Sequence, residues 1–262
     1  MPITIRTPIR HLSQEQFGEV AYRVMRCVFE IHRDFGRLFD EKIYKRELFH
    51  RYPGVQLEVP IEITHGSFRK VQYIDVLVDN GAPFEFKTVD AINPRHAAQL
   101  LHYLLLAGLS HSKLVNLRKD SVEHEFVNTT LTRDDRIHFE TADFGWAKKI
   151  IGAEHFREVL IAVLRDWGTG LDLQLYEEAM THLLGGEAHV VADVEVRSSA
   201  ERVLGRQKLK LASPRVAFVV TTLTEGRNEY ENHTRRLLRH TDLDAILWAN
   251  IGLKLVTFTA IT

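Results

Sequence analysis

One segment of the sequence carries residues whose types and spacing could support metal-assisted chemistry. Asp75 lies ten residues before Glu85, and Lys87 follows Glu85 two positions later. Because residues i and i+2 of a strand point to the same face, Glu85 and Lys87 are expected side by side. A hairpin turned at Asp79-Asn80-Gly81 would bring Asp75 next to them. Carboxylate oxygens suit Mg²⁺ or Mn²⁺, and a nearby lysine can orient a water or stabilise charge that develops on a phosphate.

The alternative is an exposed hairpin on which the two acids and the lysine are simply solvated. An isolated Asp…Glu-x-Lys pattern usually has that explanation. Here Glu85 lies between Phe84 and Phe86, and Asp75 lies inside the apolar run from Ile74 to Val78. Charged residues within such short apolar runs are seldom buried unless they are paired or bind a ligand, so the sequence favours a site.

Composition limits the class of protein. The 262 residues are 45% hydrophobic and carry a formal charge of −1, which allows large cores but gives no global basic field of the kind typical of nucleic-acid binders. The single cysteine, Cys27, excludes an internal disulfide and a multi-cysteine zinc site. No run approaches the ~18 apolar residues of a membrane span, and the start lacks the apolar segment of a signal peptide. We therefore expect a cytoplasmic protein that does not enter a membrane.

Any phosphate contacts are then expected to be local. One stretch of the first half is rich in basic residues, namely Arg33, Arg37, Lys42, Lys45, Arg46 and Arg51. This stretch is the candidate for such contacts.

The hydrophobic pattern predicts an α/β arrangement. A capping box at Ser13 and Gln16 begins a helix that should end at Gly36. The Asn93-Pro94 pair should open a later helix. The remaining elements are expected as a helix over 38–50, strands over 55–63, 68–78 and 83–89, a helix over 95–109, and strands over 113–117 and 123–127. This order predicts an α/β sandwich with the Asp and Glu-x-Lys strands at the centre of the sheet.

Several further motifs occur in order along the first half. They are Ile31 to Gly36, Glu41-x-x-Tyr44, Asp75 to Val78, Glu85-Phe-Lys87, and Gln99 to Leu104 followed by Gly108. Together they make residues 18–128 resemble the GxxExxY proteins, a branch of the PD-(D/E)xK nuclease superfamily related to RecB-type nuclease domains. One departure is Leu38, which stands where the family's name motif has its first glycine. Its effect is expected on the backbone geometry of the turn into the second helix more than on the chemistry.

The resemblance implies roles for individual residues. Glu41 would join Asp75 and Glu85 as a third ligand of Mg²⁺, for which Mn²⁺ should substitute, and the backbone carbonyl of Phe86 would be a further ligand. Lys87, Glu85 and Asp75 would be catalytic. Gln99 and Tyr103, four apart and so on one helix face, would complete the catalytic set by holding the lysine or a phosphate oxygen. The nearby His32, His96 and His102 are expected to be structural, because hard Mg²⁺ sites favour oxygen.

The second half of the chain aligns with the first. Residues 166–176 lie over residues 34–44 without a gap at an offset of 132, which grows to 137 where His233 lies over His96. In this alignment every site candidate is replaced: Glu41 by Leu173, Glu85 by Val219, Lys87 by Thr221, Gln99 by Arg236, Tyr103 by His240, and Asp75 by a position near Lys210. Chance similarity between two α/β segments is the alternative.

These alignments predict tandem restriction-endonuclease-like α/β/α sandwiches, the second of them degenerate. The expected domains are a nuclease-like domain at 1–131, a linker at 132–149 and a degenerate repeat at 150–262. The two would pack through apolar faces as an intramolecular pseudo-dimer. The second could also serve as a substrate clamp, in which Lys210 and Arg236 hold a phosphate backbone.

Two functions remain open. In the first, the N-terminal domain is a Mg²⁺-dependent nuclease that hydrolyses phosphodiester bonds in nucleic acid, with DNA expected ahead of RNA. In the second, the chain is a catalytically inactive module that binds nucleic acid or protein. The intact set of six site residues favours the nuclease, because acids repel phosphates unless a cation intervenes. A different metal-dependent phosphoesterase would use the same groups.

Overall fold

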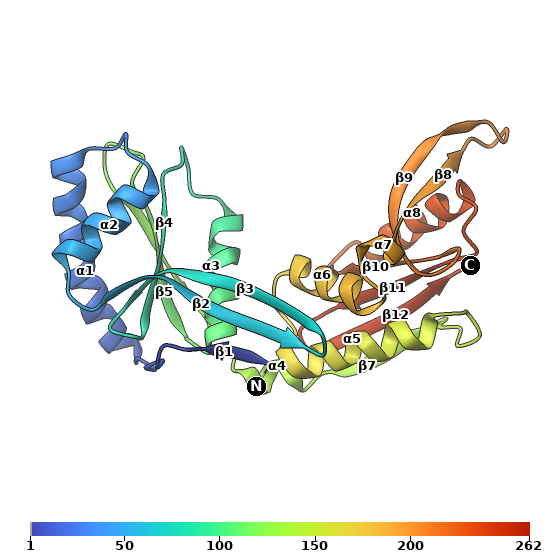
Figure 1. Cartoon of the computed structure of the whole chain (residues 1–262), viewed down its shortest axis with the longest axis horizontal. Helices are drawn as coiled ribbons and strands as arrows, with labels where there is room; N and C mark the ends of the chain where they lie inside the picture. Colours follow the sequence, from blue (N-terminus) through green and yellow to red (C-terminus); the bar gives the residue numbers. More distant parts are fainter. Residues whose placement is uncertain (1) are drawn as a thin grey trace. The chain divides into compact units, whose positions relative to one another are not determined.

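The computed structural model describes residues 2–262, which divide into two compact units (Figure 1). The first unit comprises the chain up to Thr64 together with Arg69–Arg133, and the second comprises His65–Phe68 and Asp134–Thr262. The linker expected at residues 132–149 is wrong as a separate segment. It contains helix α4 (Arg133–Ile137) and strand β7 (Glu140–Phe144), and β7 pairs in parallel with the last strand of the second unit.

Helix α1 (Gln14–Phe35) begins and ends where the sequence predicts. The backbone N–H of Gln16 donates to Ser13 Oγ at 3.2 Å, and Ser13 N–H donates to Gln16 Oε1 at 3.0 Å, which closes the capping box. The helix stops at Gly36, whose φ of +70° favours glycine. Cys27 is buried on its inner face. Within residues 2–262, no helix is both long and apolar enough to cross a bilayer.

The first sheet has the strand order β1-β2-β3-β4-β5-β6. Its strands are β1 (Ile3–Ile5), β2 (Val55–His65), β3 (Phe68–Val78), β4 (Ala82–Lys87), β5 (His111–Asn116) and β6 (Glu123–Asn128). Strand β4 is central, antiparallel to β3 and parallel to β5. The β3–β4 turn has positive φ at Asp79 (+50°) and Asn80 (+60°), as a tight hairpin requires. Val76 pairs with Phe84, and this register sets Asp75 across from Glu85.

Helices cover both faces of this sheet, which gives the expected α/β sandwich (Figure 1). Helices α1 and α2 (Glu41–Arg51) lie on one face, and α3 (Pro94–Ala107) lies on the other. Phe84 and Phe86 belong to the core under α1 and α2. Because side chains alternate along a strand, the intervening Glu85 points to the face that α3 covers.

The second unit has its own six-stranded sheet, in the order β7-β12-β11-β10-β9-β8. Its further elements are α5 (Ala153–Trp167), α6 (Leu173–Leu183), α7 (Glu187–Val190), β8 (Val191–Arg197), β9 (Val203–Ser213), β10 (Val216–Thr221), α8 (Arg227–Arg239), β11 (Ala245–Ile251) and β12 (Leu255–Ile261). Apart from the short α7, these follow the order of the first unit: two helices, three neighbouring strands, a helix and two strands. The parallel pair β4–β5 corresponds to β10–β11, and the antiparallel pair β5–β6 corresponds to β11–β12.

Candidate active site

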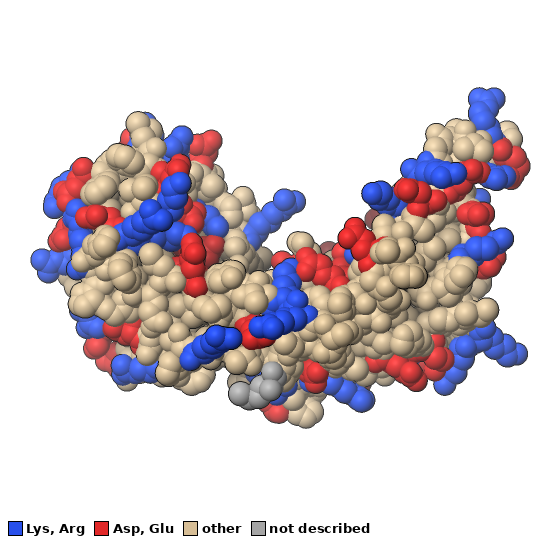
Figure 2. All heavy atoms as spheres, in the orientation of Figure 1, with Lys and Arg blue, Asp and Glu red and all other residues tan. Residues whose placement is uncertain are grey.

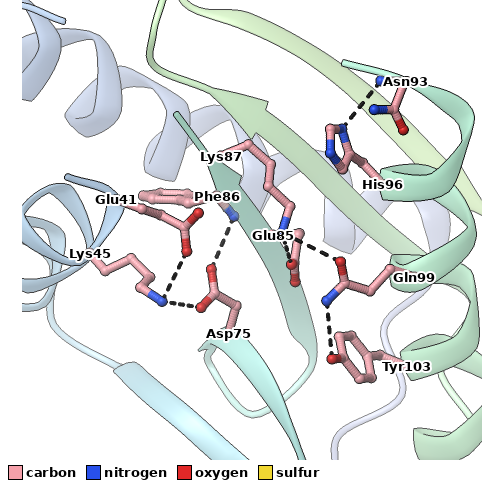
Figure 3. Close-up of polar contacts among 10 residues, drawn as sticks. All are labelled: Glu41, Lys45, Asp75, Glu85, Phe86, Lys87, Asn93, His96, Gln99 and Tyr103. Atoms are coloured by element: carbon pink, nitrogen blue, oxygen red, sulfur yellow. Dashed lines mark hydrogen bonds and ion pairs between the residues drawn. The ribbon is translucent and has the colours of Figure 1, made fainter. Parts of the chain in front are cut away.

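The hairpin brings Asp75, Glu85 and Lys87 together at the centre of the first sheet (Figure 3). The ammonium group of Lys87 donates to Glu85 Oε1 at 2.7 Å. Across the hairpin, Asp75 Oδ2 accepts the backbone N–H of Phe86 at 3.1 Å. All three side chains are shielded from solvent, with exposed fractions of 12%, 4% and 16% in sequence order. These charges are therefore held within the sandwich rather than solvated on an exposed hairpin.

Helix α3 brings Gln99 and Tyr103 to the same place. Asn93 caps the helix, since its side chain accepts the backbone N–H of Arg95, and Pro94 is the first helical residue. The four-residue spacing then puts both polar side chains on the face toward β4. Lys87 Nζ donates to Gln99 Oε1 at 3.4 Å, and Gln99 Nε2 donates to the Tyr103 hydroxyl at 3.2 Å.

The start of helix α2 supplies the remaining acid, Glu41, and is fixed by a buried tyrosine. The Tyr44 hydroxyl donates to the carbonyl of Gly36 at 2.6 Å and accepts the backbone N–H of Phe39 at 3.3 Å. Leu38, at the position where the motif glycine is missing, lies exposed in this turn. The helix begins at Glu41 and not at residue 38, because Asp40 still has an extended backbone.

Lys45 is a further residue of the site, which the sequence predicts only as part of the basic stretch. It lies one turn after Glu41 on α2, and its ammonium group contacts Glu41 Oε1 at 3.3 Å and Asp75 Oδ1. The spacing from Glu41 to Lys45 is a common ion-pair signal on a helix. The contact with Asp75 has no such signal, because the two residues are 30 positions apart and on different elements.

Burial and like charges set the protonation of the site. Burial raises the pKa of Glu85 to about 7, with Asp75 and Glu41 adding to the rise and Lys87 opposing it. Burial and the Asp75 carboxylate likewise raise the pKa of Glu41. Burial acts against the charge of Lys87, but the carboxylates of Glu85, Glu41 and Asp75 together outweigh it, so the pKa of Lys87 is raised. The site thus holds charged lysines beside a carboxyl group that titrates near neutrality.

The expected metal ligands Glu41, Asp75 and Glu85 do not form a closed set. Within residues 2–262, no three His, Cys, Asp or Glu side chains are arranged to hold an ion. Lys45 contacts both Glu41 and Asp75, and Lys87 takes one oxygen of Glu85. The other oxygen, Glu85 Oε2, is buried without a hydrogen-bond partner, and a cation would satisfy it. The three carboxylates therefore suit a divalent ion that takes the place of the ammonium groups of Lys45 and Lys87.

The basic stretch of the first half is largely neutralised by acids. Its ion pairs include Arg37–Asp120, Lys42–Asp40, Lys45–Asp75 and Arg51–Asp34. On the face shown in Figure 2, Lys and Arg lie among Asp and Glu and make no continuous basic surface. Few basic side chains of this stretch are therefore left without an acidic partner for the local phosphate contacts expected there.

The three nearby histidines have partners outside the catalytic set. His32 Nε2 lies 3.0 Å from the carbonyl of Lys119, His96 accepts the backbone N–H of Asn93, and His102 Nε2 lies 2.7 Å from Gln72 Oε1. These contacts agree with the structural role expected for each imidazole.

The second unit carries none of this chemistry at the aligned positions. Val219 takes the place of Glu85, and Thr221 donates to Asn250 Oδ1 at 2.7 Å in a buried contact. Of the two cations expected to form a substrate clamp, Lys210 donates to the Glu177 carboxylate at 3.0 Å. The clamp itself stays a prediction.

Comparison with known proteins bears on the first unit alone. Residues 18–128 match the family model of the PD-(D/E)XK nuclease superfamily. The matched region holds all six expected site residues, and its mixed α/β sandwich is consistent with the PD-(D/E)XK fold. No curated protein and no solved structure matches the chain. The superfamily match indicates nuclease-type hydrolysis for the first unit.

Proposed function

We propose that the first unit is a divalent-metal-dependent nuclease of the GxxExxY branch, which hydrolyses phosphodiester bonds in DNA or RNA. The observation that carries the proposal is the linked set at the centre of the sheet. Lys87 bonds to both Glu85 and Gln99, and Asp75 lies across the same hairpin. A buried lysine held between a carboxylate and an amide, beside two further acids, has little structural purpose that apolar residues would not serve better.

In this proposal each side chain has a distinct task. Glu41, Asp75 and Glu85 would hold the ion, Mg²⁺ with Mn²⁺ as a substitute, which supplies a Lewis acid for a phosphate oxygen. Lys87 directs its ammonium at the space beside the carboxylates, where it can orient an attacking water or stabilise negative charge on the phosphate. Gln99 fixes the position of Lys87, and Tyr103 in turn fixes the amide of Gln99.

One observation favours an inactive binding module as the second candidate. Lys45 contacts both carboxylates, Glu41 and Asp75, so each acid has a cationic partner without a metal. A module that had lost catalysis could keep such an ion pair for stability. It would bind nucleic acid or protein equally well with and without divalent ions.

We further infer that the second unit is a degenerate copy of the first. The shared order of elements and strand pairing supports this, and so does one local detail. The Tyr176 hydroxyl donates to the carbonyl of Gly168 at 2.6 Å and accepts the backbone N–H of Leu171 at 3.1 Å. These contacts repeat those of Tyr44 at the offset of 132 predicted by the alignment. The second unit would then serve as a structural partner of the nuclease.

The test is a cleavage assay on single- and double-stranded DNA and RNA, with Mg²⁺, Mn²⁺ or chelator. We expect cleavage of at least one substrate, dependent on the ion and lost in Asp75→Asn. The matched control is Asp193→Asn, an exposed acid on β8 of the second unit. Binding without cleavage, unaffected by chelator, would favour the inactive module.

A further inference from the structure

Lys45 is placed unusually for a lysine. Its side chain is only 10% exposed, whereas the side chain of Lys42 on the same helix is 66% exposed. Lysine is seldom buried to this extent unless it is paired. Its ammonium group bridges two of the three carboxylates proposed to bind metal, Glu41 from α2 and Asp75 from β3. Figure 3 shows the bridge on the side of the site away from Gln99 and Tyr103.

The second unit has an ion pair between the aligned helix and a strand, but among the described residues no acid site lies beside it. Glu177 on α6 aligns with Lys45, and it accepts from Lys210 on β9 at 3.0 Å. Helix and strand are thus joined by opposite charges in both units, but the signs are reversed. Only the first unit puts the cation on the helix and the acid on the strand. In that arrangement the lysine competes for a carboxylate that the site needs.

A count of charges shows what the bridge does. With Glu41, Asp75 and Glu85 ionised and two lysines protonated, the site carries three negative and two positive charges, a net charge of −1. A divalent ion would bring it to +1. Without the charge of Lys45, the net charge of the site would be −2 before the ion binds and 0 afterwards. The same ion would then be attracted more strongly.

We propose that Lys45 is an internal counter-ion, which a divalent metal must displace from Asp75 and Glu41. The inference rests on the proposed function, because it assumes that these carboxylates take a metal. Lys45 holds the two acids together when no metal is bound and lowers the affinity for metal. Its role is therefore to position ligands and set metal affinity, not to contact the substrate.

The experiment compares Mn²⁺ binding and thermal unfolding in the wild type, Lys45→Met, Lys45→Arg and the control Lys42→Met. Lys45→Met should bind Mn²⁺ about tenfold or more tightly, because one positive charge beside the ion is gone. It should also melt lower than the wild type without metal and gain more on Mn²⁺ addition. Lys45→Arg, which keeps the charge, and Lys42→Met should both bind as the wild type does.

Each alternative result has a definite meaning. Equal or weaker Mn²⁺ binding by Lys45→Met, with wild-type binding intact, would overturn the counter-ion role. Absence of Mn²⁺ binding by the wild type would instead overturn the proposed function. If Lys45→Met is unfolded without metal, its recovery of a cooperative transition in Mn²⁺ supports the proposal, and failure to recover contradicts it. Lys45→Gln, which keeps a polar group of similar length, repeats the comparison with less structural change.

Discussion

The two units of this chain use the same scaffold contacts in different chemical settings. In the first, Asn116 at the end of β5 accepts the backbone N–H of Val89 at 3.1 Å and donates to its carbonyl at 2.8 Å. In the second, Asn250 at the end of β11 makes the same two bonds to Leu223, at 2.7 and 3.1 Å. These side chains fasten the segment after the central strand in both units. These asparagine contacts are therefore present both in the unit that carries the acids and lysines of the site and in the unit that does not.

The difference between the units lies on the face of the central strand opposite Phe84 in the first unit and opposite Phe218 in the second. In β4 this face carries Glu85 and Lys87, and in β10 it carries Val219 and Thr221. Phe84 and its aligned residue Phe218 are both buried on the other face. On the proposal that the second unit is a degenerate copy, such a sandwich has lost its polar site and kept its core, which agrees with the general separation of fold and function.

The largest expected contrast concerns metal binding. Asp75→Asn with Glu85→Gln should abolish binding of Mn²⁺ and the accompanying rise in melting temperature, because both acids serve the ion. The matched change in the second unit, Asp193→Asn with Glu195→Gln on β8, should leave binding unchanged. Calorimetry is the measurement. Equal Mn²⁺ binding by the wild type and the first double variant would place the metal elsewhere.

The next contrast is the pH dependence of stability without metal. The pKa of Glu85 is raised to about 7 in the folded protein, above the ordinary value of 4.5 for a glutamate carboxyl. Its contribution to stability is therefore full below the unfolded pKa and is lost as pH rises through about 7. The free energy of unfolding of the wild type minus that of Glu85→Gln, measured with denaturant, should fall by up to about 3 kcal/mol as the pH rises from the unfolded pKa of Glu85 through about 7. A difference that stays flat with pH would show that Glu85 titrates normally.

A smaller effect is expected at the two buried tyrosines. Tyr176→Phe leaves the buried carbonyl of Gly168 and the buried N–H of Leu171 without their partner, at a cost of about 1–3 kcal/mol. Tyr44→Phe should cost less by denaturant unfolding, because Gly36 and Phe39 are exposed and water can replace the hydroxyl. Only Tyr44→Phe should also weaken Mn²⁺ binding, since it loosens the turn that places Glu41. Equal weakening of Mn²⁺ binding by both variants would contradict the placement of the metal in the first unit alone.

The sequence predicts this scaffold well where local rules operate. The hairpin at Asp79 and Asn80, the capping box at Ser13 and the spacing of Gln99 and Tyr103 each depend on residues close in sequence, and the structure contains all three. The linker prediction failed because β7 is paired only through the distant β12. Lys45 was missed as a site residue because its partner Asp75 lies on another element, 30 positions away in the sequence.

The most direct test of the central claim is the cleavage rate of Lys87→Ala with Mg²⁺ and a saturating nucleic-acid substrate. If Lys87 orients water or stabilises charge on phosphate, the rate should fall by roughly two to four orders of magnitude. The control Lys42→Ala removes an exposed lysine from α2 and should cleave at the wild-type rate. Mn²⁺ binding by Lys87→Ala should persist, which separates loss of chemistry from loss of the metal. An unchanged cleavage rate for folded Lys87→Ala would contradict the account.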